Sequence, residues 1–86
     1  MPLRIAAKQS GRVTVVRVDG RLRKRGAAEL EKVCQSIVGP LCLDLANLLS
    51  VDADGARVIS ELEARGAAVA GVSPYVDMLL KRANHV

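Results

Sequence analysis

Oxygen-bearing side chains gather in one short stretch, which reads Ser50-Val51-Asp52-Ala53-Asp54-Gly55. Together with Glu61, it matches several positions of a calcium-binding EF-hand loop. The match fails at its first ligand position, where serine replaces aspartate, and the residues before it predict a strand where an EF-hand has a helix. We therefore expect helix capping and loop hydrogen bonds rather than a metal site, with Asp54 capping the next helix or placing charge in its first turn.

Other groups that do chemistry are scarce. His85 is the single histidine, and it stands one residue from the end of the sequence, so a catalytic Ser-His-Asp or Cys-His arrangement is not expected. Cys34 and Cys42 lie among apolar residues, which is typical of core cysteines. The seven glycines are isolated from one another and form no phosphate-binding loop. We expect no enzyme, no cofactor and no metal.

A basic stretch, Arg21-Leu22-Arg23-Lys24-Arg25, stands out in a chain of formal net charge +4. Such a stretch can attract the phosphates of nucleic acids or lipids. The sequence has no Phe or Trp, and its one aromatic residue is Tyr75, so base stacking is not expected. We expect no nucleic-acid partner and leave two roles open: a solvated loop, or a contact with an acidic protein surface.

The first half of the chain predicts a hairpin, a helix and a strand. Residues 3–8 alternate between apolar and polar, residues 9–11 supply a turn, and residues 13–18 form a β-branched run that Asp19-Gly20 ends. A helix follows with apolar positions three and four apart, and Gly39-Pro40 stops it. Its apolar positions are Ala27, Leu30, Val33, Cys34 and Ile37. The alternating residues 41–45 then predict a third strand.

The second half repeats the change from strand to helix. After a connection over residues 46–54 comes a helix with Val58, Ile59 and Leu62 on one face, and then a small-residue strand over 67–72. Ser73-Pro74 opens a third helix in the favoured order of cap and first residue. Its predicted inward face comprises Val76, Leu79, Leu80 and Ala83.

This order, β-β-α-β-α-β-α, predicts an α/β fold with a mixed four-stranded sheet in a single domain, residues 1–86. The length suits one core, and a composition of 50% hydrophobic and 26% charged residues is typical of a folded chain. Two helices connect parallel strands. Since functional loops gather at the carboxyl ends of parallel strands, the order points to residues 46–55.

Several segments in this order resemble a STAS domain, the module of bacterial anti-sigma factor antagonists. Residues 13–20 with Leu22 are similar to the second strand and glycine of the family, and residues 41–48 to its aspartate-bearing third strand. Val51-Asp52-Ala53-Asp54-Gly55 falls on its hydrophobic-Asp-Ser-Ser-Gly signature. Residues 65–74 match its final glycine, strand and helix start. The resemblance covers most of the chain and implies a STAS-like fold.

The resemblance also implies function through binding rather than catalysis. Antagonists of this family offer the signature loop and the helix after it to a serine kinase that is also the anti-sigma factor. Phosphorylation of the first signature serine disrupts the pairing. That position here is Ala53, which has no hydroxyl, so binding is constitutive or Asp54 mimics a partly phosphorylated state. The partner-binding residues implied are Asn47, Ser50, Asp52, Ala53, Asp54, Gly55 and Arg57.

The expected partner is accordingly an anti-sigma factor or a serine kinase-like protein. The basic residues after Gly20 depart from the family pattern, and the short form of the chain resembles the STAS accessory subunit of a bacterial phospholipid-trafficking ABC transporter. Its ATPase is the alternative partner. With neither a signal peptide nor an apolar membrane span in the sequence, we expect a bacterial, cytoplasmic protein that is not membrane-embedded. A homodimer stays open. We also expect a bulky residue at Gly55 to abolish binding and leave the fold intact.

Overall fold

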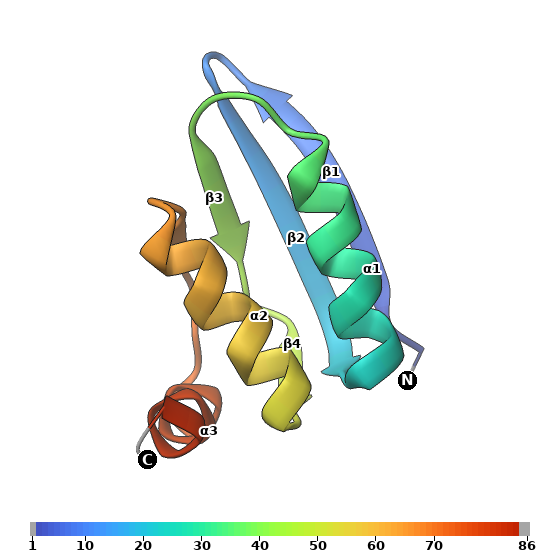
Figure 1. Ribbon diagram of the computed structural model, residues 1–86, viewed down its shortest axis with the longest axis vertical. Coiled ribbons are helices and arrows are strands. Elements are labelled where there is room, and N and C mark those ends of the chain that lie inside the picture. The colour runs from blue at the N-terminus through green and yellow to red at the C-terminus, as the bar shows by residue number, and fades with distance from the viewer. Residues whose placement is uncertain (1, 85–86) are drawn as a thin grey trace.

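The computed structural model describes residues 2–84 and confirms the predicted α/β order, with one additional short strand (Figure 1). The helices and strands are β1 (Arg4–Ser10), β2 (Val13–Leu22), α1 (Lys24–Gln35), β3 (Leu41–Asp44), β4 (Leu48–Val51), α2 (Ala53–Ala64), β5 (Ala68–Ala70) and α3 (Pro74–Asn84). None of these helices is long and apolar enough to cross a membrane.

The sheet is mixed, as predicted. β1 and β2 form an antiparallel hairpin in which Ile5 lies opposite Val18. β2 and β3 are parallel, and so are β3 and β5, because α1 and α2 act as the crossover connections. The strand order is β1-β2-β3-β5, and β4 pairs with the last residues of β2.

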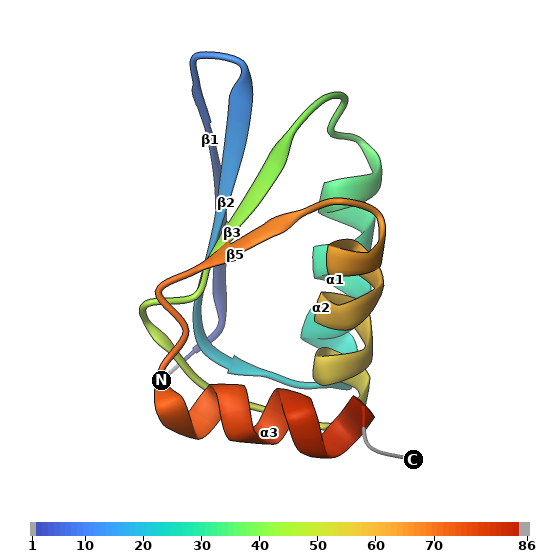
Figure 2. The same ribbon diagram turned by 90° about the vertical axis from the view of Figure 1, so that its left-hand side faces the viewer.

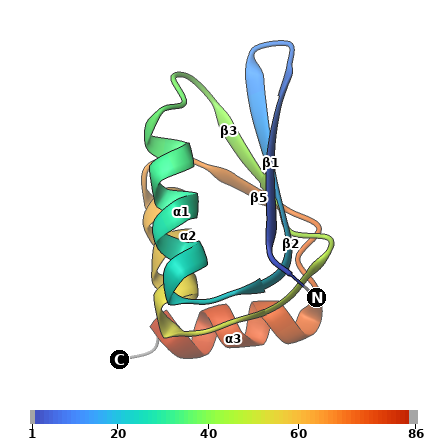
Figure 3. The same cartoon turned by 90° about the vertical axis from the view of Figure 1, so that its right-hand side faces the viewer.

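α1 and α2 lie side by side on one face of this sheet, whereas α3 lies across one end of the molecule (Figures 2 and 3). Both α1 and α2 begin at that end, which we call the helix end. The opposite end carries the turn between β1 and β2, residues 10–13, and the connection between α1 and β3, residues 36–40. We call it the hairpin end.

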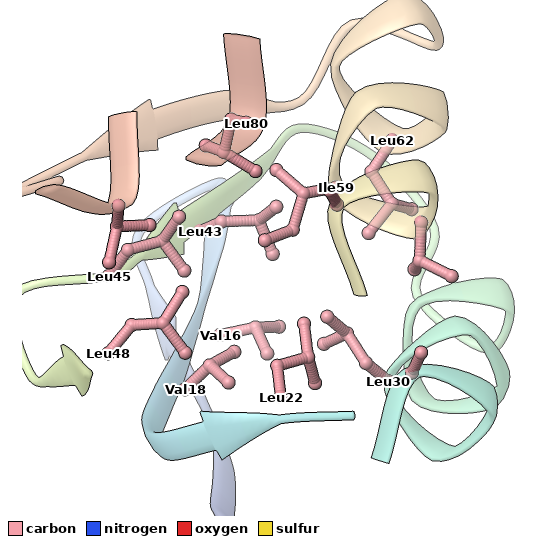
Figure 4. Close-up of a cluster of buried hydrophobic side chains, with 14 of the residues drawn as sticks. Val16, Val18, Leu22, Leu30, Leu43, Leu45, Leu48, Ile59, Leu62 and Leu80 are labelled. Carbon is pink, nitrogen blue, oxygen red and sulfur yellow. The ribbon is translucent and has the colours of Figure 1, made fainter. Parts of the chain in front are cut away.

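The core fills the space between the sheet and the helices (Figure 4). Val16, Val18 and Leu43 of the sheet are fully buried, and so are Leu30 of α1 and Ile59 of α2. On α3 the predicted inward face is wrong at one position. Val76 and Leu80 are buried, but Ala83 is exposed, because a helix lying across the end of a sheet contacts the core only along a narrow stripe.

β2 does not end at Asp19-Gly20, as the sequence predicted, but continues to Leu22. Gly20 has a φ of +96°, which most residues avoid, and the pairing register shifts between Gly20 and Arg21. The strand bends there and runs beneath the core (Figure 3). Its last residues pair with β4, within the connection predicted as a loop. Because β2 continues past the bend, its last backbone N–H and C=O groups need hydrogen-bond partners, and β4 provides them.

Candidate functional site

The predicted binding stretch, residues 47–57, runs along the helix end through β4 into the first turns of α2. Asn47 is exposed, and its backbone carbonyl accepts a hydrogen bond from the Gly20 amide at 3.0 Å. Ser50 is half-buried in β4, opposite Arg21 of β2. The start of the stretch is therefore part of the sheet rather than a free loop.

Asp52 joins the starts of two helices. It is the N-cap of α2, where its Oδ1 accepts a hydrogen bond from the Gly55 amide at 2.8 Å. Its Oδ2 accepts a second bond from the amide of Lys24, the first residue of α1, at 3.0 Å. The N-cap of α1, Arg23, makes no side-chain cap of its own. The first amides of a helix have no hydrogen-bond partner within the helix. The Asp52 carboxylate supplies a partner for one such amide in α1 and for one in α2.

Gly55 supports the same junction by its lack of a side chain. It is buried, and a Cβ there would lie 2.6 Å from the carbonyl oxygen of Leu22. That oxygen also accepts a hydrogen bond from the Asp52 amide at 3.1 Å, so it is fixed in place. The expectation that a bulky residue at Gly55 leaves the fold intact is therefore wrong, since it would force α2 away from β2.

Ala53, Asp54 and Arg57 present the accessible part of the site on the first turns of α2. Ala53 is exposed, and the side chains of Asp54 and Arg57 keep 44% and 55% of their surface accessible. Arg57 donates from Nη1 to Glu61 Oε1 at 3.0 Å, and its Nη2 lies 3.9 Å from Asp54 Oδ1. The hydrogen bond to Glu61 is the main cause that raises the pKa of Arg57. Exposed pairs like these add little stability, so the three residues are available to a partner.

The basic stretch adjoins this surface, which the sequence did not reveal. Lys24 contacts Asp52 through its amide, and the side chains of Arg21, Arg23, Lys24 and Arg25 are exposed. None of these four side chains forms an ion pair with another residue of the described range 2–84. Hydrophobic periodicity detects helices and strands, but it does not indicate that two helix starts share one cap.

The residues considered for other chemistry lie apart from this surface. Within the described range, no three His, Cys, Asp or Glu side chains are grouped as a metal site would need. Cys34 is buried in α1, and burial raises its pKa, while Cys42 is half-buried in β3. His85 lies outside the described residues.

Comparison with known proteins places the fold. No family model and no curated protein matches the chain. Among solved structures, it is similar to the unphosphorylated form of the anti-sigma factor antagonist SpoIIAA, with a TM-score of 0.68 at 18% identity over 91% of this chain and 82% of that one. A variant of RsbS from Moorella thermoacetica gives a TM-score of 0.75 at 16% identity, over 96% and 80% of the two chains.

A third similar structure is a protein named Mglu, with a TM-score of 0.70 at 22% identity over 80% of this chain. The chain spans only 20% of the length of that protein. These likenesses, together with the observed element order, define a STAS-like fold. They confirm the fold that the sequence resemblance implied.

Proposed function

We propose that the protein is a non-catalytic interaction module that binds a protein partner through residues 47–57 and the exposed face of α2. The observation that carries this proposal is the accessible group Ala53, Asp54 and Arg57, which Asp52 and Gly55 hold on a rigid helix start. A similar structure, SpoIIAA, is named as an anti-sigma factor antagonist, which supports an anti-sigma factor or a serine kinase-like protein as the partner.

The module binds without a phosphorylation switch at the signature position. Ala53 occupies that exposed position and has no hydroxyl. A phosphate would bring about −1.5 to −2 charges, whereas Asp54 brings one and lies 3.9 Å from the Arg57 guanidinium. Arg57 is also bonded to Glu61 at 3.0 Å, so it offsets the Asp54 charge only in part. Because Asp54 lies one residue after the signature position and carries less charge than a phosphate, we favour constitutive binding over a built-in mimic of the phosphorylated state. Such a module would act in a bacterial cytoplasmic signalling circuit that regulates transcription.

The alternative, an accessory subunit of a phospholipid-trafficking ABC transporter, has less support. SpoIIAA is named as an antagonist, and none of the three similar structures described above is named as part of a transporter. We therefore keep the transporter ATPase as an outcome of the test rather than as a second proposal.

A pull-down from the native cell lysate, followed by mass spectrometry, tests the proposal. Ala53→Glu adds an acidic residue to the first turn of α2, where the helix dipole favours it, so this variant should stay folded. Ala6→Glu is the matched control, because Ala6 is exposed on β1 opposite Arg17 of β2, outside residues 47–57 and outside α2. We expect wild type and Ala6→Glu to recover an anti-sigma factor or serine kinase, and Ala53→Glu to recover at least about tenfold less.

Equal recovery by Ala53→Glu would show that the first turn of α2 is not the interface. Recovery of a transporter ATPase instead of a kinase or anti-sigma factor would favour the transporter subunit. Thermal unfolding of both variants by circular dichroism checks that a loss of binding is not a loss of fold.

A further inference from the structure

The helix end carries five basic side chains in addition to Arg57, which belongs to the proposed partner surface. Arg21, Arg23, Lys24 and Arg25 lie at the junction of β2 with α1, and Arg82 lies on α3. All five are exposed, and none forms an ion pair within residues 2–84. Lys81 of α3, in contrast, pairs with Asp77 at 3.0 Å. The five side chains are therefore not held in ion pairs. The carboxylate of Asp52 lies at the Lys24 amide, but the four basic residues at the junction of β2 with α1 still leave an excess of positive charge there.

These residues lie on elements that form a row. β4 pairs with the last residues of β2, and α3 packs against β4. Leu22 is fully buried, so alternation along the strand turns Arg21 and Arg23 away from the core. Figures 2 and 3 show α3 lying along the same end, beneath the sheet. β2, β4 and α3 are therefore neighbours along the helix end.

Apolar side chains are exposed on the same row. Four large hydrophobic residues are exposed among residues 2–84, and three belong to β4 or α3: Leu49 at 49%, Tyr75 at 55% and Met78 at 43%. Tyr75, Met78 and Arg82 have helical spacing on the side of α3 away from the buried Val76 and Leu80. α3 thus combines a buried apolar stripe with an exposed face that is apolar and basic.

We propose that this end docks on an anionic membrane surface. Clusters of four or more Lys and Arg bind anionic lipid headgroups, and a helix lying in the interface inserts apolar side chains between them. A tyrosine suits that depth, since its ring is apolar and its hydroxyl is polar. Nucleic acid would bind the basic side chains, but it would not explain the exposed apolar Met78. α3 lies along the end of the molecule, where it can face a flat surface (Figure 2).

Vesicle co-sedimentation of the full chain tests this docking, with phosphatidylcholine vesicles that contain about a third phosphatidylglycerol. We expect binding to these vesicles and none to pure phosphatidylcholine. Arg21→Ala with Arg23→Ala should weaken it about tenfold to thirtyfold. Met78→Ala should weaken it by roughly fivefold, since half-exposed apolar surface is lost.

Lys8→Ala with Arg12→Ala is the matched control, because it removes the same charge from the hairpin end. The longest dimension of the molecule is 34 Å, several times the Debye length of about 8 Å at physiological salt, so we expect less than twofold weakening. Equal weakening by both pairs, or no effect of Met78→Ala, would overturn the proposal in favour of unspecific charge attraction. Absence of binding to the anionic vesicles would overturn it as well, even where the protein partner is recovered.

Discussion

The two ends of the molecule differ in how tightly the chain is held. At the hairpin end, Gly11 forms the turn between β1 and β2, and a Cβ built there meets no atom within 4 Å. At the helix end, a Cβ on Gly55 would lie 2.6 Å from the Leu22 carbonyl oxygen. The same residue type is thus a turn former at one end and a close-packing requirement at the other.

The polar contacts follow the same division. Asp52 accepts hydrogen bonds from the amides of Lys24 and Gly55, which lie in different helices. The side-chain bond near the hairpin turn is local and long, from Gln9 Nε2 to the Gly11 carbonyl at 3.5 Å. Part of the signature stretch is therefore structural. Asp52 and Gly55 build the platform, while Ala53, Asp54 and Arg57 are left to contact a partner.

The largest expected effect comes from filling the space at Gly55. We expect Gly55→Val to cost about 3 kcal/mol or more, because the Leu22 carbonyl is backbone and cannot rotate away. Gly11→Ala should cost only about 1 kcal/mol, for the strain of a residue at φ +62°. Urea unfolding followed by circular dichroism measures both. A Gly55→Val protein as stable as Gly11→Ala would contradict the close approach of α2 to β2.

A smaller effect is expected from removing the shared cap. Asp52→Ala should cost about 2 kcal/mol, since a helix cap contributes roughly 1 kcal/mol and the Lys24 amide loses its acceptor too. Asp54→Ala should cost less, about 0.5 to 1 kcal/mol, because Asp54 makes an exposed ion pair and places one charge in the first turn of α2. The same urea titration ranks them, and equal costs would mean that Asp52 does not bridge the two helices.

Asp52→Asn tests whether both hydrogen bonds of the Asp52 side chain contribute to stability. Asparagine caps a helix about as well as aspartate, but it has an NH2 group in place of the second oxygen. Because the Gly55 and Lys24 amides bond different oxygens of Asp52, one of the two amides would face this donor and lose its acceptor. We expect its stability to fall between those of wild type and Asp52→Ala. A stability equal to that of Asp52→Ala would indicate that the carboxylate charge, rather than the second hydrogen bond, matters.

The smallest effect concerns Cys34, far along α1 from the shared cap. Burial raises the pKa of this thiol, so the folded state favours the protonated form. The buried, protonated thiol contributes its full stabilisation at a pH below the ordinary thiol pKa of about 8.5. This stabilisation is lost as the pH rises through the higher pKa that the thiol has in the folded protein. We expect the fall in unfolding free energy between about pH 8 and 10 to be smaller in Cys34→Ala, by urea titration at each pH. An identical fall would contradict the burial of this thiol.

Much of the fold was predictable from local patterns. The spacing of Leu30 and Cys34, or of Val58 and Ile59, indicates which side of a helix is buried, because helix and strand periods differ. The bend of β2 at Gly20 and the strand β4 were not predictable in this way. Each depends on backbone pairing between segments more than twenty-five residues apart, which leaves no periodic signal in either segment.

From the sequence, only the position of the candidate site along the chain was predictable, and not the roles of its residues. The resemblance pointed to Asp52 through Gly55, but it could not separate the residues that build the junction from those left exposed. That separation depends on the distance from Gly55 to Leu22 and on the bond from Lys24 to Asp52. The predicted inward face of α3 did not include Tyr75 and Met78, which are exposed. That they share one end of the molecule with the basic residues of β2 was not predictable, because it follows from how α3 crosses the end of the sheet.

Hydrogen–deuterium exchange of the protein, alone and bound to the partner recovered by pull-down, tests most directly whether the helix end is the binding end. We predict slower amide exchange on binding in residues 53–58 of α2, with unchanged exchange in residues 8–14 of the hairpin. Slower exchange confined to residues 8–14, with unchanged exchange at the start of α2, would contradict partner binding at the helix end.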